Sequence, residues 1–156
     1  MRRKELEVTN PNQIEQIIQH CNCIRIGMYA DDEMYIVPLS FGYEKKDDTY
    51  IFYFHSAKQG RKIEMLKQNP NVAFEMDCGY ELSFVEDLNE CSNAYKSIIG
   101  TGKITFLEDF DTKVHALTKL MEHYHPHREM HFNESLVQRT CVFQLEVTSL
   151  TAKQHP

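Results

Sequence analysis

The sequence predicts a mainly β protein, an antiparallel β-barrel with peripheral helices. Most of the chain consists of short runs in which apolar and polar residues alternate, separated by turn residues. Only three segments show helical spacing. Gly100 and Gly102 interrupt the longest alternating run, which is typical of a strand that bends to close a barrel. The length of 156 residues fits one domain covering residues 1–156.

The first helix and the first two strands follow from caps and alternation. Asn10 and Pro11 predict a helix start, because asparagine caps helix N-termini and proline suits the first helical position. Alternation predicts a strand over residues 24–28 and a second strand over residues 35–43. Pro38 has no N–H to donate, so the second strand is expected at an edge or a bulge.

The later elements are expected on the same grounds. They are a turn at 31–32, an aromatic strand over 50–54, a helix over 61–68, strands over 72–76 and 95–106, a helix that opens at Asp109 or Asp111, a polar loop over 124–133 and a last strand over 140–147. Residues 80–91 fit neither period clearly, and parts of them are expected to be strand.

Charge and composition exclude several classes of function. The formal net charge is −6 and no long basic stripe occurs, so nucleic acid is not an expected partner. No run of eighteen apolar residues is present, which argues against a membrane span. The charged N-terminus lacks the apolar core of a signal peptide. The odd number of cysteines, five, favours reduced thiols, so we expect a cytoplasmic protein.

The stretch from Ile51 to Lys62, I-F-Y-F-H-S-A-K-Q-G-R-K, suits a bound phosphate. An aromatic strand leads through a short turn to a helix whose N-terminus offers free N–H groups and a partial positive charge. Arg61 and Lys62 add two full charges, Ser56 adds a hydroxyl, and Gly60 lets the backbone approach a ligand closely. The alternative is a strand–turn–helix connection with a solvated basic corner.

Four motifs together resemble a known family. They are M-Y-I-V-P-L-S-F-G-Y (34–43), Y-F-H-S-A-K-Q-G-R-K (53–62), L-K-Q-N-P-N-V-A-F-E (66–75) and Y-K-S-I-I-G-T-G-K-I (95–104). This order resembles the pyridoxamine 5'-phosphate oxidase-like FMN-binding split barrels, most closely the nitroimidazole-resistance (Nim) branch. The resemblance runs from the first helix to Lys153. It implies a split β-barrel, FMN as cofactor, and a homodimer with flavin near the interface.

The resemblance also implies roles for individual residues. The residues that match the phosphate and ribityl site are His55, Ser56, Ala57, Gly60, Arg61 and Lys62. The backbone of Val37, Pro38 and Leu39 matches the strand that meets the flavin ring, although plain strand packing would explain these residues equally well. Tyr95 and Ser97 match positions near the phosphate at the subunit interface. His55 is the candidate for a catalytic, proton-handling role, because its reference pKa lies near neutrality.

The implied activity is oxidoreduction of a small organic substrate, with nitroaromatic reduction as the example the family suggests and a nicotinamide as the reductant. Vitamin B6 synthesis is not expected, because the C-terminal signature of true pyridoxamine 5'-phosphate oxidases is missing and Ala152 stands where the family usually has glycine. Two alternatives stay open. One is a flavin carrier or sensor without turnover, and the other is a haem-binding relative with a histidine ligand.

Two further expectations concern the histidines and the dimer. Five of the eight histidines fall within residues 115–131: His115, His123, His125, His127 and His131. We expect a solvated loop and no metal there, because Pro126 breaks the helical spacing between His123 and His127. We also expect the strand aromatics to leave a face or edge that a second subunit covers; these are Tyr43, Tyr50, Phe52 and Phe54.

Overall fold

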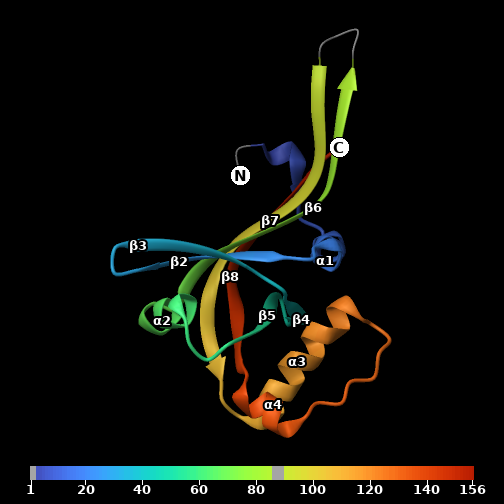
Figure 1. Ribbon diagram of the computed structural model, residues 1–156. Coiled ribbons are helices and arrows are strands. Elements are labelled where there is room, and N and C mark those ends of the chain that lie inside the picture. Colours follow the sequence, from blue (N-terminus) through green and yellow to red (C-terminus); the bar gives the residue numbers. More distant parts are fainter. Residues whose placement is uncertain (1–2, 86–89) are drawn as a thin grey trace.

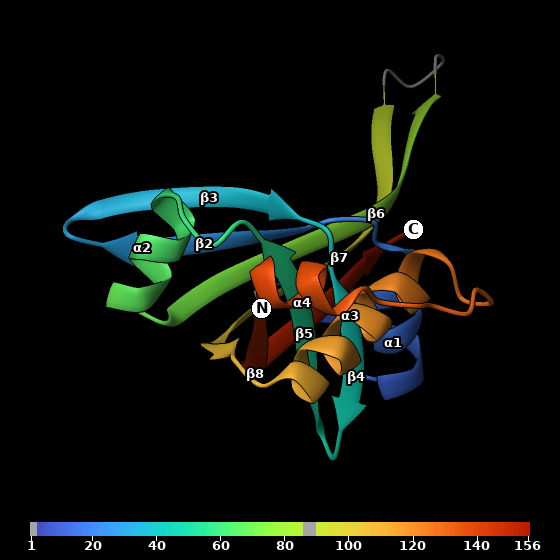
Figure 2. The same cartoon turned by 60° about the horizontal axis from the view of Figure 1, so that its bottom comes forward.

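The computed structural model describes residues 3–85 and 90–156. It consists of one antiparallel sheet with the strand order β3-β2-β6-β7-β8-β5-β4, and β1 pairs with β8 (Figures 1 and 2). The strands are β1 Glu7–Val8, β2 Ile24–Ala30, β3 Glu33–Leu39, β4 Gly42–Lys46, β5 Thr49–Ser56, β6 Asn71–Val85, β7 Glu90–Leu107 and β8 Cys141–His155. The predicted fold class, mainly antiparallel β with peripheral helices, is confirmed.

The helices are η1 Lys4–Leu6 (a 3-10 turn), α1 Pro11–His20, α2 Arg61–Gln68, α3 Phe110–Tyr124 and α4 Glu134–Arg139. Local chemistry explains their starts: the Asn10 side chain accepts from Asn12 N, and the Asp109 side chain accepts from Thr112 N. Sequence analysis did not predict α4, since six residues are too few to show a helical period. Among the described residues, no helix has both the length and the apolar character needed to cross a bilayer.

The predicted strand over 35–43 is two strands. The chain leaves β3 at Leu39, and Phe41 turns into the core before β4 begins at Gly42. The prediction that Pro38 marks an edge is confirmed, because β3 is the last strand on its side of the sheet order. Much of the ambiguous segment 80–91 is strand, since β6 continues to Val85 and β7 starts at Glu90; residues 86–89 lie outside the described chain.

The core contradicts one expectation about the aromatics of β5. Tyr50, Phe52 and Phe54 are buried inside the barrel, and Tyr43 is half-buried against it, so a partner is not needed to cover them. Phe54 stacks on Phe143 of β8, which closes the packing across these two strands. The sequence rationale for a dimer from these residues is therefore wrong, although the dimer itself is a separate question.

Gly100 and Gly102 act by allowing close approach. A Cβ at Gly100 would overlap the Phe74 ring and the Ser149 carbonyl oxygen, and one at Gly102 would overlap the Glu146 carbonyl oxygen. The pairing of β7 with β8 shifts register between Thr101 and Gly102, which matches the bend expected of this strand. Beyond the body of the barrel, β6 and β7 continue as a projecting hairpin (Figure 1).

Candidate functional site

The turn between β5 and α2 has the backbone of an anion site. Gly60 is the residue before the first turn of α2 and has φ 127°, a conformation that L side chains rarely adopt. Among the described residues, no side chain caps this helix end, so its first N–H groups keep their donor capacity. A Cβ at Gly60 would meet no described atom within 4 Å, so the space beside this glycine is open. These features fit a bound phosphate group.

Arg61 links the start of α2 to the edge strand β3. Its Nη2 donates to Glu33 Oε2 at 2.7 Å, and its guanidinium lies 4.6 Å from the centroid of the Tyr35 ring. Both partners of this ion pair are exposed. Exposed pairs contribute about 0–1 kcal/mol, so an incoming phosphate can compete for the arginine. Sequence analysis placed neither Glu33 nor Tyr35 in the site, because only the fold brings β3 beside α2.

His55 and Lys62 lie close to each other on the same turn. His55 pairs with Val142 at the end of β5, and its side chain reaches solvent. The pKa of His55 is lowered, first because neighbouring atoms partly remove the ring from water and then because Lys62 is positively charged. The imidazole is therefore mainly neutral at pH 7 and has both a hydrogen-bond donor and an acceptor.

Ser56 and Ala57 complete the turn in a less open arrangement. Ser56 Oγ donates to Ala57 O at 2.7 Å, so the hydroxyl faces the local backbone. Ser56 also pairs with Cys141 in the sheet, at the end of the barrel. A serine hydroxyl rotates readily about χ1, so contact of this hydroxyl with a phosphate requires a rotamer change.

Val37, Pro38 and Leu39 lie on the open edge of the sheet. They pair with Ile26, Arg25 and Ile24 of β2 on one side only. Val37 and Leu39 pack against the core and Pro38 is exposed. An edge strand leaves backbone groups free to meet a ligand.

Tyr95 and Ser97 do not join this constellation within one chain. Tyr95 pairs with His155 and Ser97 with Lys153, near the C-terminus, which Figure 1 shows well away from α2. The Tyr95 ring stacks between Tyr80 and His155 at centroid distances of 5.8 Å each, and Lys153 Nζ donates to its phenol oxygen. No local sequence pattern predicts this cluster, because its members come from three strands: Tyr80 from β6, Tyr95 from β7, and Lys153 and His155 from β8.

The register places these two residues on the outer face of the sheet, which we define as Arg25, Tyr29, Met34, Ile36, Pro38, Glu75, Asp77, Tyr95, Ser97 and Ile99. Side chains directly opposite each other in antiparallel strands lie on the same side, and the pairs Tyr29–Met34, Glu75–Ile99 and Asp77–Ser97 connect the face from β3 to β7. Met34 is 82% exposed and Ile36 is 67% exposed. This face therefore presents large apolar side chains to water around the Arg25–Glu75 and Arg25–Asp77 ion pairs.

The histidine-rich segment divides into two parts. His125, His127 and His131 are exposed and follow α3 in a loop, as predicted. His115 and His123 lie within α3 instead: His115 Nε2 is 3.0 Å from Glu44 Oε2, and His123 Nε2 is 2.8 Å from Cys21 O. The His123 ring also packs 4.4 Å from Phe41, so this histidine belongs to the packing. In the described part of the chain, no three His, Cys, Asp or Glu side chains are placed to share a metal ion.

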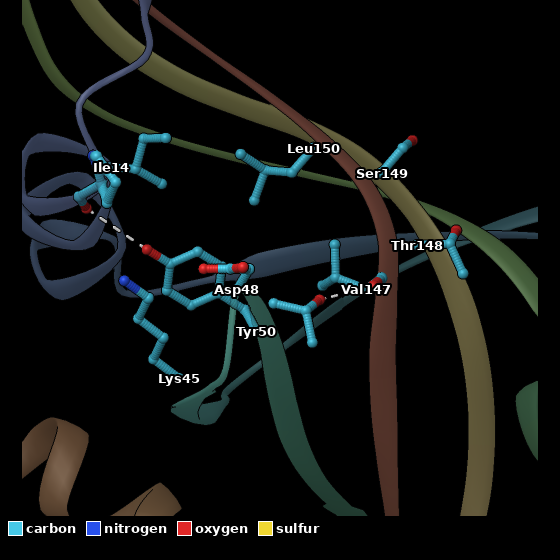
Figure 3. Close-up of a pocket in the computed structure, with 10 residues that line it drawn as sticks. Ile14, Lys45, Asp48, Tyr50, Val147, Thr148, Ser149 and Leu150 are labelled. Atoms are coloured by element: carbon cyan, nitrogen blue, oxygen red, sulfur yellow. Dashed lines mark hydrogen bonds between the residues drawn. The ribbon is translucent and has the colours of Figure 1, made fainter.

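A separate cavity of about 280 Å³ lies between the start of α1, the β4–β5 turn and β8 (Figure 3). Lys45 of β4 and Asp48 of the turn line it, and the Tyr50 hydroxyl donates to Pro11 O at 3.5 Å. None of the predicted site residues lines this cavity.

Comparisons with known proteins agree with this architecture. The family model of pyridoxamine 5'-phosphate oxidase matches residues 10–154. A solved structure of a candidate 5-nitroimidazole antibiotic resistance protein from Bacteroides thetaiotaomicron is 30% identical, with a TM-score of 0.83, covering 96% of this chain and 86% of that one. No protein with a curated description matches the sequence closely enough to assign a relationship.

More distant structures share the fold. A flavocytochrome from Azotobacter vinelandii is 15% identical with a TM-score of 0.80, over 100% of this chain and 72% of that one. An FAD-binding protein from Mesorhizobium loti is 18% identical with a TM-score of 0.65, over 94% and 96% of the two chains. The fold is thus that of the split β-barrels. The chain belongs to the pyridoxamine 5'-phosphate oxidase family.

Proposed function

We propose that the protein binds FMN at the β5–α2 turn and acts as an oxidoreductase on a small organic substrate. The observation that carries the proposal is the N-terminus of α2, where Gly60 is followed by the cations Arg61 and Lys62 and Arg61 reaches the edge strand β3. A flavin phosphate is a dianion, and this turn supplies helix N–H groups and full positive charges in a protein of net charge −6.

The residues have distinct tasks in this proposal. Arg61 and Lys62 bind the phosphate, and Gly60 lets the backbone approach it. The backbone of Val37 to Leu39 orients the ring, since an edge strand offers N–H and C=O groups without an added charge. His55, neutral at pH 7, holds or moves a proton near the ring. When bound, the flavin supplies the electron transfer.

We further propose that the site is completed in a homodimer. Tyr95, Ser97 and Lys153 lie near the C-terminus, at the ends of β7 and β8 that are far from the turn in their own chain. The exposed apolar residues Met34 and Ile36 share the sheet's outer face with Tyr95 and Ser97. Packing the outer faces of two copies would cover these apolar side chains and bring one copy's Tyr95 toward the other's β3.

The proposal also covers the reaction and the compartment. The 30% identical Bacteroides protein is named for 5-nitroimidazole resistance, so nitroaromatic reduction with a nicotinamide as electron donor is the activity to assay first. The five unpaired cysteines are compatible with a reducing cytoplasm. A flavin carrier or sensor would bind through the same residues without turnover.

Titration of the apo-protein with FMN and FAD, combined with anaerobic reduction by NADH or NADPH in the presence and absence of a nitroimidazole, tests the proposal. We expect FMN binding that the double variant Arg61→Ala/Lys62→Ala weakens by at least tenfold, and reoxidation of the reduced flavin by the nitroimidazole. Lys46→Ala, which removes an exposed cation in β4, is the matched control. Absence of flavin binding would refute the function, whereas binding without turnover would leave a carrier or sensor.

A further inference from the structure

A basic pocket lies beside the β5–α2 turn, at the end of the barrel. It has a volume of about 200 Å³ and is bounded by α2, the end of β7, the start of α3 and the start of β8. Three lysines line it: Lys58 from the turn, Lys67 from α2 and Lys113 from α3. Glu108 is the acidic residue among its lining residues, so the lining carries a net positive charge.

Lys113 is the unusual member of this group. It is only 6% exposed, although lysines are almost never fully buried unless their charge is satisfied. Its Nζ donates to Thr140 O at 3.2 Å, and that carbonyl is its one hydrogen-bond acceptor among the described residues. An ammonium group has three N–H donors, so most of the donor capacity of a buried charge is left for a ligand or for water.

The pocket is distinct from the site proposed for the flavin phosphate. Lys58, Arg61 and Lys62 lie within five residues of one another in the sequence. The structure places Arg61 at Glu33 and Tyr35 and Lys62 near His55, while Lys58 lines the pocket together with Lys67 and Lys113. Two groups of cations therefore flank the same turn on different sides.

The Cys141 thiol lies in this pocket, and the charged groups around it shift its pKa. Burial raises the pKa of this thiol, and so does the charge of Glu108, whereas the neighbouring Ser56 hydroxyl and the charges of Lys113 and Lys67 lower it. Cys141 is half-buried and lines the cavity, so its reactivity depends on whether the cavity is filled.

We propose that this pocket binds a phosphate group, either free inorganic phosphate or the phosphate of a small ester. The charge selects an anion, and lysine ammonium groups bind phosphate as point charges. The volume lies below that of pockets for drug-sized ligands, which start at about 300 Å³, so the ligand is small. The alternative is a structural role, in which the Lys113 ammonium group only stabilises the negative C-terminal end of the α4 helix dipole. Thr140 directly follows the last residue of that helix.

Alkylation of Cys141 by iodoacetamide, followed peptide by peptide with mass spectrometry, tests the proposal on the full chain. The rate is measured with inorganic phosphate, with glycerol 3-phosphate, and with chloride at matched ionic strength. We expect phosphate to slow the alkylation of Cys141 and to leave the alkylation rate of the exposed Cys91 unchanged. Protection by both compounds assigns the pocket to phosphate esters, and protection by inorganic phosphate alone assigns it to the free ion.

Variants separate this pocket from the turn. Lys113→Met should raise the phosphate concentration needed for half protection by about tenfold or more. Lys67→Met, at an exposed position, should also raise it. Arg61→Met and the exposed Lys103→Met should leave it unchanged. Three results would overturn the proposal. They are no protection in the wild type, protection in Lys113→Met and Lys67→Met that equals that of the wild type, and protection that is lost in Arg61→Met. Because Arg61→Met disables the proposed flavin site, failure of one site is distinguishable from failure of the other.

Discussion

Arg61 and Glu33 form an ion pair of 2.7 Å that connects the first residue of α2 to the first residue of β3. The arginine needed for a phosphate is therefore shared with a carboxylate, which repels the same phosphate. Removing that carboxylate should strengthen phosphate binding, because the phosphate then neither displaces Glu33 from Arg61 nor is repelled by its charge.

We predict that Glu33→Gln binds FMN up to about fivefold more tightly than the wild type, because an exposed ion pair is worth about 0–1 kcal/mol. Fluorescence titration of flavin measures this. Riboflavin affinity should not change, and Glu134→Gln, an exposed carboxylate in α4, serves as control. Equal gains for FMN and riboflavin would show that Glu33 does not compete with a phosphate.

His55→Ala should weaken FMN binding or slow reoxidation of the reduced flavin, because His55 stands beside Ser56 and Lys62 on the turn. The double variant His125→Ala/His127→Ala should keep the flavin spectrum, since both residues are exposed in the loop after α3. His123 is left intact because it packs on Phe41. Absorbance spectra and metal analysis of both variants decide; loss of a chromophore or metal from the loop variant alone would support the haem or metal alternative.

Dimer formation should depend on the outer face. Ile36→Asp places a charge beside Met34 and Tyr29 on this face, and we predict a monomer mass in light scattering at micromolar concentration. Leu136→Asp, at an equally apolar exposed position of α4, should stay dimeric. A monomeric wild type, or a dimer that tolerates Ile36→Asp, would contradict the proposed interface.

Stability should fall in acid because of His123. Burial lowers the pKa of His123 in the folded state. The hydrogen bond to Cys21 O raises this pKa, but by less than burial lowers it. A histidine with a depressed folded pKa binds protons more readily when unfolded, so its contribution is complete above pH 6.5 and is lost as the pH falls below that value. His55 acts in the same direction.

Urea unfolding at pH 7.5 and pH 5.5 measures this effect. His123→Gln keeps an N–H donor for Cys21 O and removes the titration, so it should lower the free energy of unfolding at pH 7.5 through lost packing on Phe41 and reduce its pH dependence. His125→Gln, in the exposed loop, is the control and should keep the full dependence. An unchanged dependence in His123→Gln would assign the acid sensitivity to other groups.

The features that the sequence predicts well are those set by residues close together in the chain, such as helix caps and helix ends. The helix over 61–68 has the predicted bounds, because Gly60 and the Asn69-Pro70 pair punctuate it, and the cap at Asn10 is confirmed by its bond to Asn12 N. Long-range pairing determined the rest. β8 extends to His155 because β7 and β1 pair with it, and the break at Phe41 arises because that ring enters the core. The Arg61–Glu33 pair and the Lys113 pocket join segments far apart in the chain, and no local pattern indicates such contacts.

The most direct test of the central claim compares the affinities of FMN and riboflavin for the wild-type apo-protein. The two flavins share the ring and ribityl chain and differ only in the phosphate, which the β5–α2 turn is proposed to bind. Losing one charge-assisted contact costs about 1.5–3 kcal/mol, so FMN should bind about ten to 150 times more tightly than riboflavin. Equal affinities would mean that Gly60, Arg61 and Lys62 do not form a flavin phosphate site.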